Sequence, residues 1–294
     1  MKQILITGAT GNTGYETIRY LFKNQTQNHI IAGVRNINKA KKKLKAFPSL
    51  EYTVFDFEKP ETFHTALQGI TSVFLLRPPH ISDIKSYFQP LIAKISEKGV
   101  REIVFLSVQG AAKSRIIPHN KIERLIREYQ LNYIFLRPSY FMQNLTTTLV
   151  HDIRYKRRII LPAGKAKLNW IDVQNIGETS AILLEQFNTW KNNAYDLTGM
   201  ENENFYKIAE MLSEVLGEKT EYKNVNPLRF YWIKKQEELP KGMIMVMIML
   251  HFLPRFQKEP EITGFYQKLT GKTPATLKTF VQREKGKFDP ILKI

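Results

Sequence analysis

The 294-residue sequence contains no cysteine, which excludes disulfide bonds, thiolate metal sites and a cysteine nucleophile. No metal site is predicted, and the lack of disulfides is consistent with a reducing compartment. The sequence does not open with a charged segment followed by an apolar run, so we expect a cytoplasmic protein. The apolar stretch at residues 243–250 falls well short of the about 20 residues that cross a bilayer, so no membrane span is expected.

Acidic residues are also scarce, since 27 Asp and Glu stand against 44 Lys and Arg and leave a formal net charge of +17. The cations are spread along the chain, and no helix-turn-helix, zinc or RNA-binding signature directs them at bases. Net charge by itself governs solubility and non-specific association. We therefore expect no specific nucleic-acid partner.

Among the features that are present, a glycine-rich turn near the N-terminus is the clearest. An apolar run of strand character ends at Thr7, and three glycines then precede a helical pattern that begins near Thr13. Strand, tight turn and helix in this order suit a bound pyrophosphate, because the helix N-terminus presents free N–H groups. An ordinary strand-to-helix turn is the alternative. The predicted dinucleotide contacts in this turn are Gly8, Thr10, Gly11, Asn12, Thr13 and Gly14.

Each glycine of the turn has a separate expected role. Gly8 can adopt the backbone angles of a sharp turn, and Gly11 has no side chain to block a phosphate. Gly14 lets the helix pack close to the strand. The spacing Gly-x-x-Gly-x-x-Gly differs from the standard Gly-x-Gly-x-x-Gly, so the strand before it and the helix after it are part of the evidence.

The end of the next strand indicates which dinucleotide is bound. An NAD site usually places Asp or Glu there to accept a hydrogen bond from the ribose, whereas an NADP site places Arg near the 2′-phosphate. The predicted strand at residues 29–34 is followed by Arg35, and no carboxylate stands at this point. A guanidinium matches a phosphate in a bidentate geometry. The sequence therefore favours NADP(H) over NAD(H).

The first half of the chain alternates between strands and helices. Strands are predicted at 29–34, 51–55, 72–76, 102–107 and 133–136, and helices at 60–67, 84–98 and 121–129. This alternation predicts a doubly wound α/β domain, a Rossmann fold with a parallel sheet. Ligands bind beyond the carboxyl ends of such strands. Asp56 and Phe57 are therefore candidates for the adenine site and Arg77 for a further cofactor contact, although a helix N-cap is an equal alternative for Asp56.

The second half predicts a smaller α/β lobe that would hold the substrate. Strands are expected at 158–161 and 194–198, and helices at 176–186, 205–216 and 275–283, the second of these ended by Gly217. The predicted domains are residues 1–150, which bind NADP, and residues 151–294, with some chain crossing back to the sheet. Residues 243–250 hold four methionines and are apolar on every face, which favours a buried core helix or a homodimer contact. A flexible wall of an apolar substrate pocket, with Met245 and Met249 as contacts, is the alternative.

These residues together resemble the NmrA-like branch of the atypical short-chain dehydrogenase/reductases, and within it the type 2 NAD(P)H:quinone oxidoreductases. The likeness rests on residues 6–14, 34–36, 56, 136–138, 141–144, 171–173, 176–177, 197–199 and 269–274. It implies NADP binding by the N-terminal domain and a substrate cleft between the lobes. Tyr140, Phe141 and Asn144 are the implied substrate contacts.

The catalytic pair of a typical short-chain dehydrogenase is missing from its usual place. The only Tyr-x-x-x-Lys spacing joins Tyr231 to Lys235, far beyond the fifth strand. At the expected helix the chain reads His119-Asn120-Lys121-Ile122-Glu123, which looks like the His-x-x-x-Glu stretch of the quinone-reductase-like members. His119 is the candidate proton shuttle and Lys121 the candidate ligand of the nicotinamide ribose, with a helix start and an exposed lysine as alternatives. Ser107 corresponds to the catalytic serine position of the superfamily.

Two functions of different classes follow. The first is an oxidoreductase that transfers a hydride from NADPH to a small apolar acceptor such as a quinone, for which solvent or His119 supplies the proton. The second is a non-catalytic NADP sensor of the NmrA type, which would have a protein partner. Nucleotide-sugar epimerisation is a weaker alternative, because it normally needs the missing tyrosine.

Overall fold

The computed structural model describes residues 1–115 and 117–289, and the chain divides into two compact units. The first unit consists of Met1–Pro138 and Val173–Leu197, and the second of Ser139–Asp172 and the chain from Thr198 onward. The boundary therefore falls at residue 138, ahead of the residue 150 that we predicted from the sequence. The segment Val173–Leu197 returns to the first unit because its strand, Asn193–Leu197, pairs with the strand that ends at Pro138.

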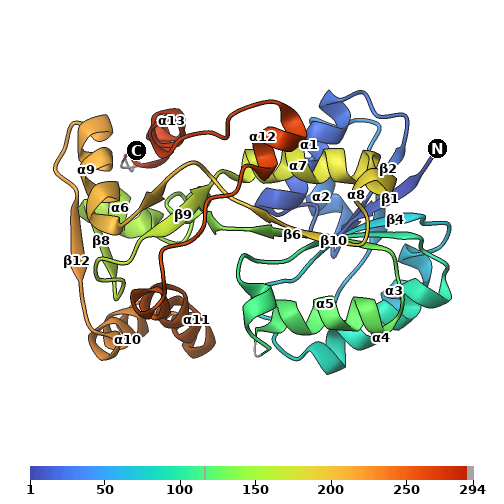
Figure 1. The fold of residues 1–294 in the computed structure, drawn as a ribbon, viewed down its shortest axis with the longest axis horizontal. Helices are drawn as coiled ribbons and strands as arrows, with labels where there is room; N and C mark the ends of the chain where they lie inside the picture. Colours follow the sequence, from blue (N-terminus) through green and yellow to red (C-terminus); the bar gives the residue numbers. More distant parts are fainter. Residues whose placement is uncertain (116, 290–294) are drawn as a thin grey trace. The chain divides into compact units, whose positions relative to one another are not determined.

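Within the described residues, the strands of the first unit form a seven-stranded sheet in the order β10-β6-β5-β4-β1-β2-β3, and all its neighbouring pairs are parallel (Figure 1). The strands are β1 (Gln3–Ile6), β2 (His29–Val34), β3 (Glu51–Val54), β4 (Ser72–Leu76), β5 (Glu102–Leu106), β6 (Tyr133–Pro138) and β10 (Asn193–Leu197). The helices are α1 (Asn12–Lys23), α2 (Ile37–Lys43), α3 (Glu61–Ala66), α4 (Ile84–Glu97), α5 (Pro118–Glu128), α7 (Val173–Glu185) and α8 (Phe187–Trp190), with a 3-10 turn at Ala111–Lys113.

Helices cover both faces of this sheet. Figure 1 shows α1, α2 and α7 on one face and α3, α4 and α5 on the other. The central strands are continuous apolar runs, such as Val73, Phe74 and Leu75 in β4, because a parallel sheet covered on both faces buries every side chain. The predicted doubly wound fold is confirmed.

Helices α1 and α7 pack unusually closely. A Cβ placed on Gly177 of α7 would lie 2.5 Å from Cβ of Glu16 and 2.6 Å from its carbonyl carbon. No side chain fits in that space, so Gly177 is required for the contact. The close contact fixes α1, whose N-terminus follows the glycine turn.

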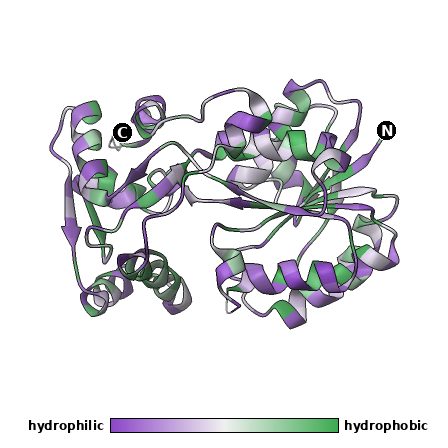
Figure 2. Ribbon diagram, viewed as in Figure 1, coloured by the Kyte–Doolittle hydropathy of each residue, from purple (hydrophilic) through white to green (hydrophobic). Residues whose placement is uncertain are grey.

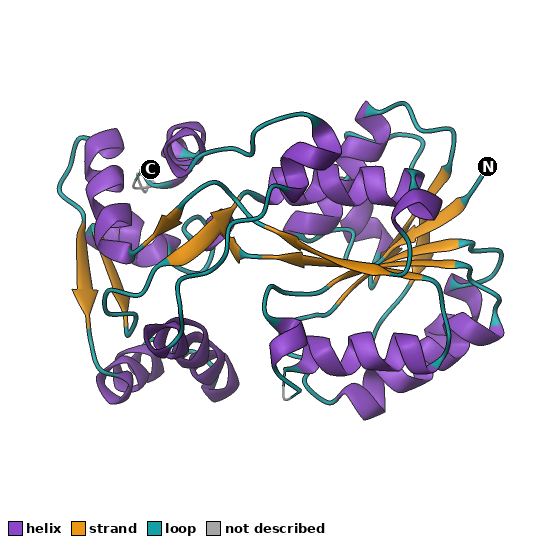
Figure 3. Cartoon of the chain, viewed as in Figure 1, coloured by secondary structure: helices purple, strands orange, loops and turns teal. Residues whose placement is uncertain are grey.

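The second unit mixes two small sheets with helices (Figure 3). Strands β11, β9 and β7 form one sheet, and β12 pairs with β8 in parallel. Its strands are β7 (Tyr140–Phe141), β8 (Arg158–Leu161), β9 (Leu168–Ile171), β11 (Asn202–Glu203) and β12 (Glu221–Asn224). Its α-helices are α6 (Val150–Lys156), α9 (Phe205–Leu216), α10 (Pro227–Gln236), α11 (Lys241–Phe252), α12 (Phe265–Thr270) and α13 (Leu277–Arg283), with 3-10 turns at Met142–Asn144, Leu253–Phe256 and Lys285–Lys287.

The core of the second unit forms around large aromatic side chains. Trp170, Phe205, Phe230 and Phe280 are fully buried and belong to one cluster. Helix α9 ends as predicted at Gly217, whose φ of +74° is a left-handed conformation that an L side chain rarely adopts. The predicted smaller α/β lobe is thus present.

The methionine-rich stretch forms helix α11, but the prediction of a buried core helix was wrong. Only Ile244, Met247 and His251 are buried in this helix, whereas Met245 is 44% and Met249 is 53% exposed. Figure 2 shows the apolar character along α11. Its sequence is apolar at nearly every position, so periodicity could not distinguish a buried helix from an exposed one. A dimer contact and a substrate wall stay predictions.

In the part of the chain that the structure describes, no helix has the length and apolarity needed to cross a bilayer. The same residues contain no group of three or more His, Asp or Glu side chains placed to hold a metal ion.

Candidate dinucleotide-binding site

The glycine turn connects β1 to α1 in the conformation that its sequence predicted. Gly8 has a φ of +59°, and a Cβ there would lie 2.6 Å from Cδ2 of Leu76. The N–H of Gly11 donates to the carbonyl oxygen of Gly8 at 2.8 Å and closes the turn. A Cβ on Gly14 would lie only 2.4 Å from that same carbonyl oxygen and 2.9 Å from Cα of Ala9. Gly14 therefore lets the helix approach the turn itself.

The N-terminus of α1 has no side-chain cap. Its N-cap residue is Gly11, no acidic residue stands in the first turn, and Thr13 is buried while Asn12 is exposed. The first N–H groups of a helix have no partner within the helix and need an acceptor from outside it. An anion is the natural acceptor at this position, because the helix dipole is positive there.

Arg35 follows β2 and is exposed at the rim of the same site. Its guanidinium makes no hydrogen bond or ion pair with any residue in the described ranges. By contrast, the neighbouring Asn36 is engaged, since its side chain accepts a hydrogen bond from the N–H of Lys39 and caps α2. Arg35 is thus a free planar cation at the position where an NADP site places an arginine.

These groups surround a pocket of about 230 Å³ at the carboxyl ends of β1, β2, β3 and β4. Six of the predicted cofactor residues line it, namely Gly8, Thr10, Gly11, Arg35, Asp56 and Phe57. The other lining residues are Gly33, Val34, Phe55, Glu58, Leu76, Pro78, Pro79, His80 and Ile81. A ligand pocket beyond the carboxyl ends of parallel strands is the usual arrangement in this fold class.

Asp56 and Phe57 occupy the side of this pocket formed by the end of β3. Asp56 Oδ1 accepts a hydrogen bond from the N–H of Glu58 at 3.1 Å, which makes a tight turn; the N-cap of α3 is Pro60. Phe57 is 7% exposed and packs against Phe55 and Phe88 with ring centroids 4.9 and 5.4 Å away. Both residues line the predicted adenine side, with the ring of Phe57 fixed by its neighbours.

Arg77 has a different position from the one its sequence suggested. Its Nη1 donates to the carbonyl oxygens of Pro78, Pro79 and Ile81, at 3.1, 3.1 and 2.5 Å. Among the described residues Arg77 is not part of the pocket lining, whereas the loop that it binds is. Arg77 therefore shapes the loop beside the pocket, and the predicted direct contact with the cofactor has no support in this geometry.

The side chain of His119 lies next to Arg77. Arg77 Nε donates to His119 Nε2 across 3.5 Å, so Nδ1 carries the proton of the neutral ring. Burial, together with the nearby guanidinium, lowers the pKa of His119 to about 3. The ring is neutral at pH 7 and has no imidazolium proton to deliver. Lys121, two residues further along α5, is exposed.

Ser107 is part of a buried network that the sequence did not predict. Its hydroxyl donates to Glu123 Oε1 at 2.6 Å, and Arg137 binds both oxygens of Glu123, through Nε at 2.9 Å and Nη2 at 2.6 Å. Glu123 is fully buried and Ser107 is 2% exposed. The His-x-x-x-Glu spacing pointed to Glu123, but Ser107 directly follows β5 and Arg137 lies in β6, so only the fold brings these two partners to it. This network joins β5, α5 and β6.

The predicted substrate residues all belong to the second unit. Phe141 and Asn144 are half-buried, and Met245 and Met249 are exposed on α11. Tyr140 bonds through its hydroxyl to Nε2 of the buried His251 at 2.9 Å. His251 Nδ1 lies 2.6 Å from the carbonyl oxygen of Met247 and must donate to it, so the Tyr140 hydroxyl is the donor to Nε2.

His251 is a further residue that sequence reasoning missed. It sits inside the apolar stretch of α11, and burial lowers its pKa to about 4. Burial also raises the pKa of Tyr140. Both groups are therefore neutral over the whole physiological range. The only signal in the sequence was a single histidine after eight apolar residues, which by itself favours no partner.

Comparison with known proteins gives the same family as the one that the sequence motifs resemble. The model of the NmrA-like family matches residues 1–269. Prestalk A differentiation protein A of Dictyostelium discoideum is 27% identical over 280 residues, covering 95% of this chain and 91% of that protein. NAD(P)H azoreductase of Xenophilus azovorans is 25% identical over 289 residues, covering 97% and 99%.

Among solved structures, NADPH-dependent quinone oxidoreductase of Escherichia coli complexed with NADPH superposes with a TM-score of 0.85 and 22% identity. The match covers 96% of this chain and 99% of that one. The family model extends over both units and includes the glycine turn, Arg35 and the Ser107 network. The chain belongs to the NmrA-like family.

Proposed function

We propose that this protein is an NADP(H)-dependent oxidoreductase that transfers a hydride to a small apolar acceptor such as a quinone. The observation that carries the proposal is one pocket with both the uncapped N-terminal turn of α1 and the unpaired Arg35 at its edge. Two of the similar proteins are an NAD(P)H azoreductase and an NADPH-dependent quinone oxidoreductase, which supports the same reaction class.

The residues present fit the cofactor. The free N–H groups at the start of α1 would hold the pyrophosphate. The absence of a Cβ leaves space for a phosphate at Gly11 and lets α1 pack closely against the turn at Gly14. Arg35 would bind the 2′-phosphate, and Asp56 with Phe57 would line the adenine side. Bound NADPH supplies the hydride.

The protein's own acid and base groups point to solvent as the source of the proton. His119 is neutral because its pKa is about 3, so it can orient an acceptor through Nδ1–H but has no acidic proton at pH 7. The hydroxyl of Ser107 is already donated to Glu123. A reduced quinone can take its proton from water, whereas a reduced ketone needs a positioned acid. Lys121, exposed on α5, stays the proposed ligand of the nicotinamide ribose.

An apolar acceptor suits the candidate substrate residues. Phe141, Met245 and Met249 offer apolar or polarizable surface, and the two methionines are exposed on one helix. Tyr140 has its hydroxyl bonded to His251, so it presents its ring while its polar end is satisfied. Asn144 adds an amide that can orient a carbonyl oxygen.

A non-catalytic NADP sensor with a protein partner is the second candidate. One observation favours it: Ser107, Glu123 and Arg137 satisfy one another, so the catalytic serine position of a dehydrogenase has no free acid beside it here. Tyr231 and Lys235, which have the dehydrogenase spacing, lie on α10 in the second unit, far along the chain from the sheet. The position of Tyr231 also disfavours nucleotide-sugar epimerisation, because that reaction normally needs the tyrosine of the Tyr-x-x-x-Lys pair beside the sheet.

The two candidates separate in one assay. Purified protein is mixed with NADPH and a panel of quinones, and absorbance at the reduced nicotinamide band is followed, with NADH and a reaction without quinone as controls. The proposal expects quinone-dependent oxidation of NADPH, and Tyr231→Phe is expected to change the rate by less than about twofold. Tight NADPH binding without turnover on any quinone would contradict the proposed quinone reduction and favour the sensor.

A further inference from the structure

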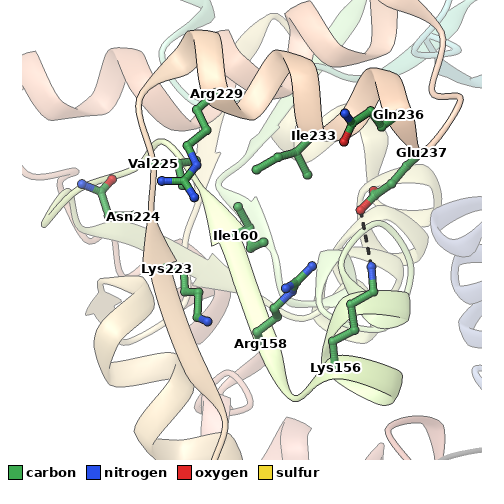
Figure 4. Close-up of a pocket in the computed structure, with 10 residues that line it drawn as sticks. All are labelled: Lys156, Arg158, Ile160, Lys223, Asn224, Val225, Arg229, Ile233, Gln236 and Glu237. Carbon is green, nitrogen blue, oxygen red and sulfur yellow. Dashed lines mark ion pairs between the residues drawn. The ribbon is translucent and has the colours of Figure 1, made fainter.

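The second unit contains a larger pocket that the proposed reaction does not use. It measures about 700 Å³, within the usual range for small-molecule sites, and it lies among α6, β8, β12 and α10 (Figure 4). Four of its ten described lining side chains are cations and one is a carboxylate. They are Lys156, Arg158, Lys223 and Arg229, with Glu237; the rest of the lining is Ile160, Asn224, Val225, Ile233 and Gln236.

The middle of the pocket is apolar. Ile160 of β8 is 5% exposed, and Val225 and Ile233 beside it are half-buried. Figure 4 shows the two arginines on opposite sides of Ile160, with Arg158 rising from β8 and Arg229 descending from α10. An occupant would therefore meet an aliphatic surface between two guanidinium groups.

Ion pairs hold one side of the pocket in place. Lys234 Nζ lies 3.0 Å from Asp152 Oδ2 and 2.7 Å from Glu237 Oε2. Lys156 Nζ lies 3.0 Å from Asp152 Oδ1 and 3.6 Å from Glu237 Oε1. Burial acts to raise the pKa of Asp152, but the two lysines outweigh it and hold that pKa below its ordinary value. Asp152 is thus ionised, and both carboxylates are already paired with lysines.

Two cations of the pocket are left without a full partner. The guanidinium of Arg229 makes no hydrogen bond or ion pair with residues 1–115 or 117–289. Arg158 Nε is shielded from solvent and makes no hydrogen bond within the same ranges; the nearest carboxylate oxygen, Asp152 Oδ1, is 3.7 Å away. A buried donor without an acceptor is unfavourable, and a ligand oxygen that accepted this hydrogen bond would relieve that penalty.

The side-chain charges around the pocket also indicate which charge an occupant should carry. Lys156, Arg158 and Lys234 face Asp152 and Glu237, which leaves one positive charge in excess. Lys223 shares Glu221 with Lys219, at 3.8 and 2.9 Å, so Glu221 does not fully cancel it, and the unpaired Arg229 adds a second excess charge. The pocket therefore carries at least two excess positive charges and suits an anion of charge −2.

We propose that this pocket binds a phosphate monoester carried on a small apolar body, with the phosphate between Arg158 and Arg229 and the apolar body against Ile160 and Ile233. A phosphate monoester has a charge of about −1.5 to −2 at pH 7 and accepts bidentate hydrogen bonds from arginine. This site is independent of the cofactor pocket, since the two share no residue.

The test is calorimetric titration of the full chain with phenyl phosphate, inorganic phosphate and phenol. Phenyl phosphate is expected to bind about tenfold more tightly than inorganic phosphate, because burying the ring adds about 1.5 kcal/mol or more, and phenol is expected not to bind. Arg229→Gln should weaken phenyl phosphate binding about tenfold or more. The Arg229 guanidinium has no partner among the described residues, so this variant should keep the wild-type melting temperature.

Two control variants locate the binding. Lys235→Gln removes a cation from the same helix, outside the pocket, and should leave the affinity within about twofold. Arg35→Asp should also leave the affinity for phenyl phosphate unchanged, because Arg35 is not part of this pocket. If phenyl phosphate were instead bound in the cofactor pocket at the start of α1, this variant would lose it. Loss with Arg35→Asp but not with Arg229→Gln, or equal binding of phenyl and inorganic phosphate, would overturn the proposal.

Discussion

Two glycine-to-alanine substitutions provide a matched test of the turn at the start of α1. Gly14 and Gly242 both lie in the first turn of a helix, and within helices alanine is favoured over glycine by up to about 1 kcal/mol. At Gly242 the added Cβ meets no atom within 4 Å, so Gly242→Ala should stabilise the protein by about 0.5–1 kcal/mol. At Gly14 the Cβ would lie 2.4 Å from a backbone carbonyl oxygen, about 1 Å inside ordinary contact.

The backbone of the turn cannot move aside as a flexible side chain would, so α1 must shift. Overpacking of this kind typically costs about 1–3 kcal/mol, which exceeds the gain in helix propensity. Gly14→Ala should therefore lower the free energy of unfolding and weaken NADPH binding, whereas Gly242→Ala should leave binding unchanged. Urea denaturation and calorimetric titration measure both effects. Equal stabilisation by the two substitutions, with NADPH affinity retained, would refute the claimed close approach.

Further predictions concern the two buried networks. His251 has its pKa lowered to about 4 from 6.5, so between these values the unfolded chain binds a proton that the folded chain excludes, and stability falls as the pH falls. Between pH 7 and pH 5 the wild type should lose about 2 kcal/mol more than His251→Asn, measured by urea denaturation at both pH values; parallel losses would contradict this. Glu123→Gln leaves the Arg137 charge without its carboxylate and should cost about 3 kcal/mol or more, while Glu128→Gln, from an exposed pair on the same helix, should cost less than about 1 kcal/mol. Similar losses of stability in the two glutamine variants would show that the buried ion pair stabilises the protein no more than the exposed one does.

The local features of the first unit could be predicted from sequence. A strand, three spaced glycines and a helix are contiguous, so their arrangement depends on short-range sterics, and Gly8 and Gly14 lie where those sterics require. The apolar strands are also local signals, as is the end of α9 at Gly217 in the second unit. The strand-end rule placed Arg35, Asp56 and Phe57 around one pocket because parallel strands share an edge.

The features that sequence analysis missed depend on contacts between distant residues. Glu123 is buried where Ser107, just after β5, and Arg137, in β6, both reach it, and no spacing in the sequence encodes that meeting. His251 likewise acquires its role from Tyr140, more than a hundred residues earlier. The sequence predicted that some chain crosses back to the sheet, but the segment that does so, Val173–Leu197, is set by the long-range pairing of β10 with β6.

The central claim is that Arg35 selects the phosphorylated coenzyme while the turn before α1 holds the diphosphate. The most direct measurement is the Kd of NADPH and of NADH for the wild type, Arg35→Asp and Lys42→Asp, the last making the same charge change on the neighbouring helix. We expect the wild type to prefer NADPH, and Arg35→Asp to weaken NADPH about 100-fold while leaving NADH nearly unchanged, with Lys42→Asp close to wild type. Equal affinity of the wild type for both coenzymes, or an unaltered preference in Arg35→Asp, would contradict the account.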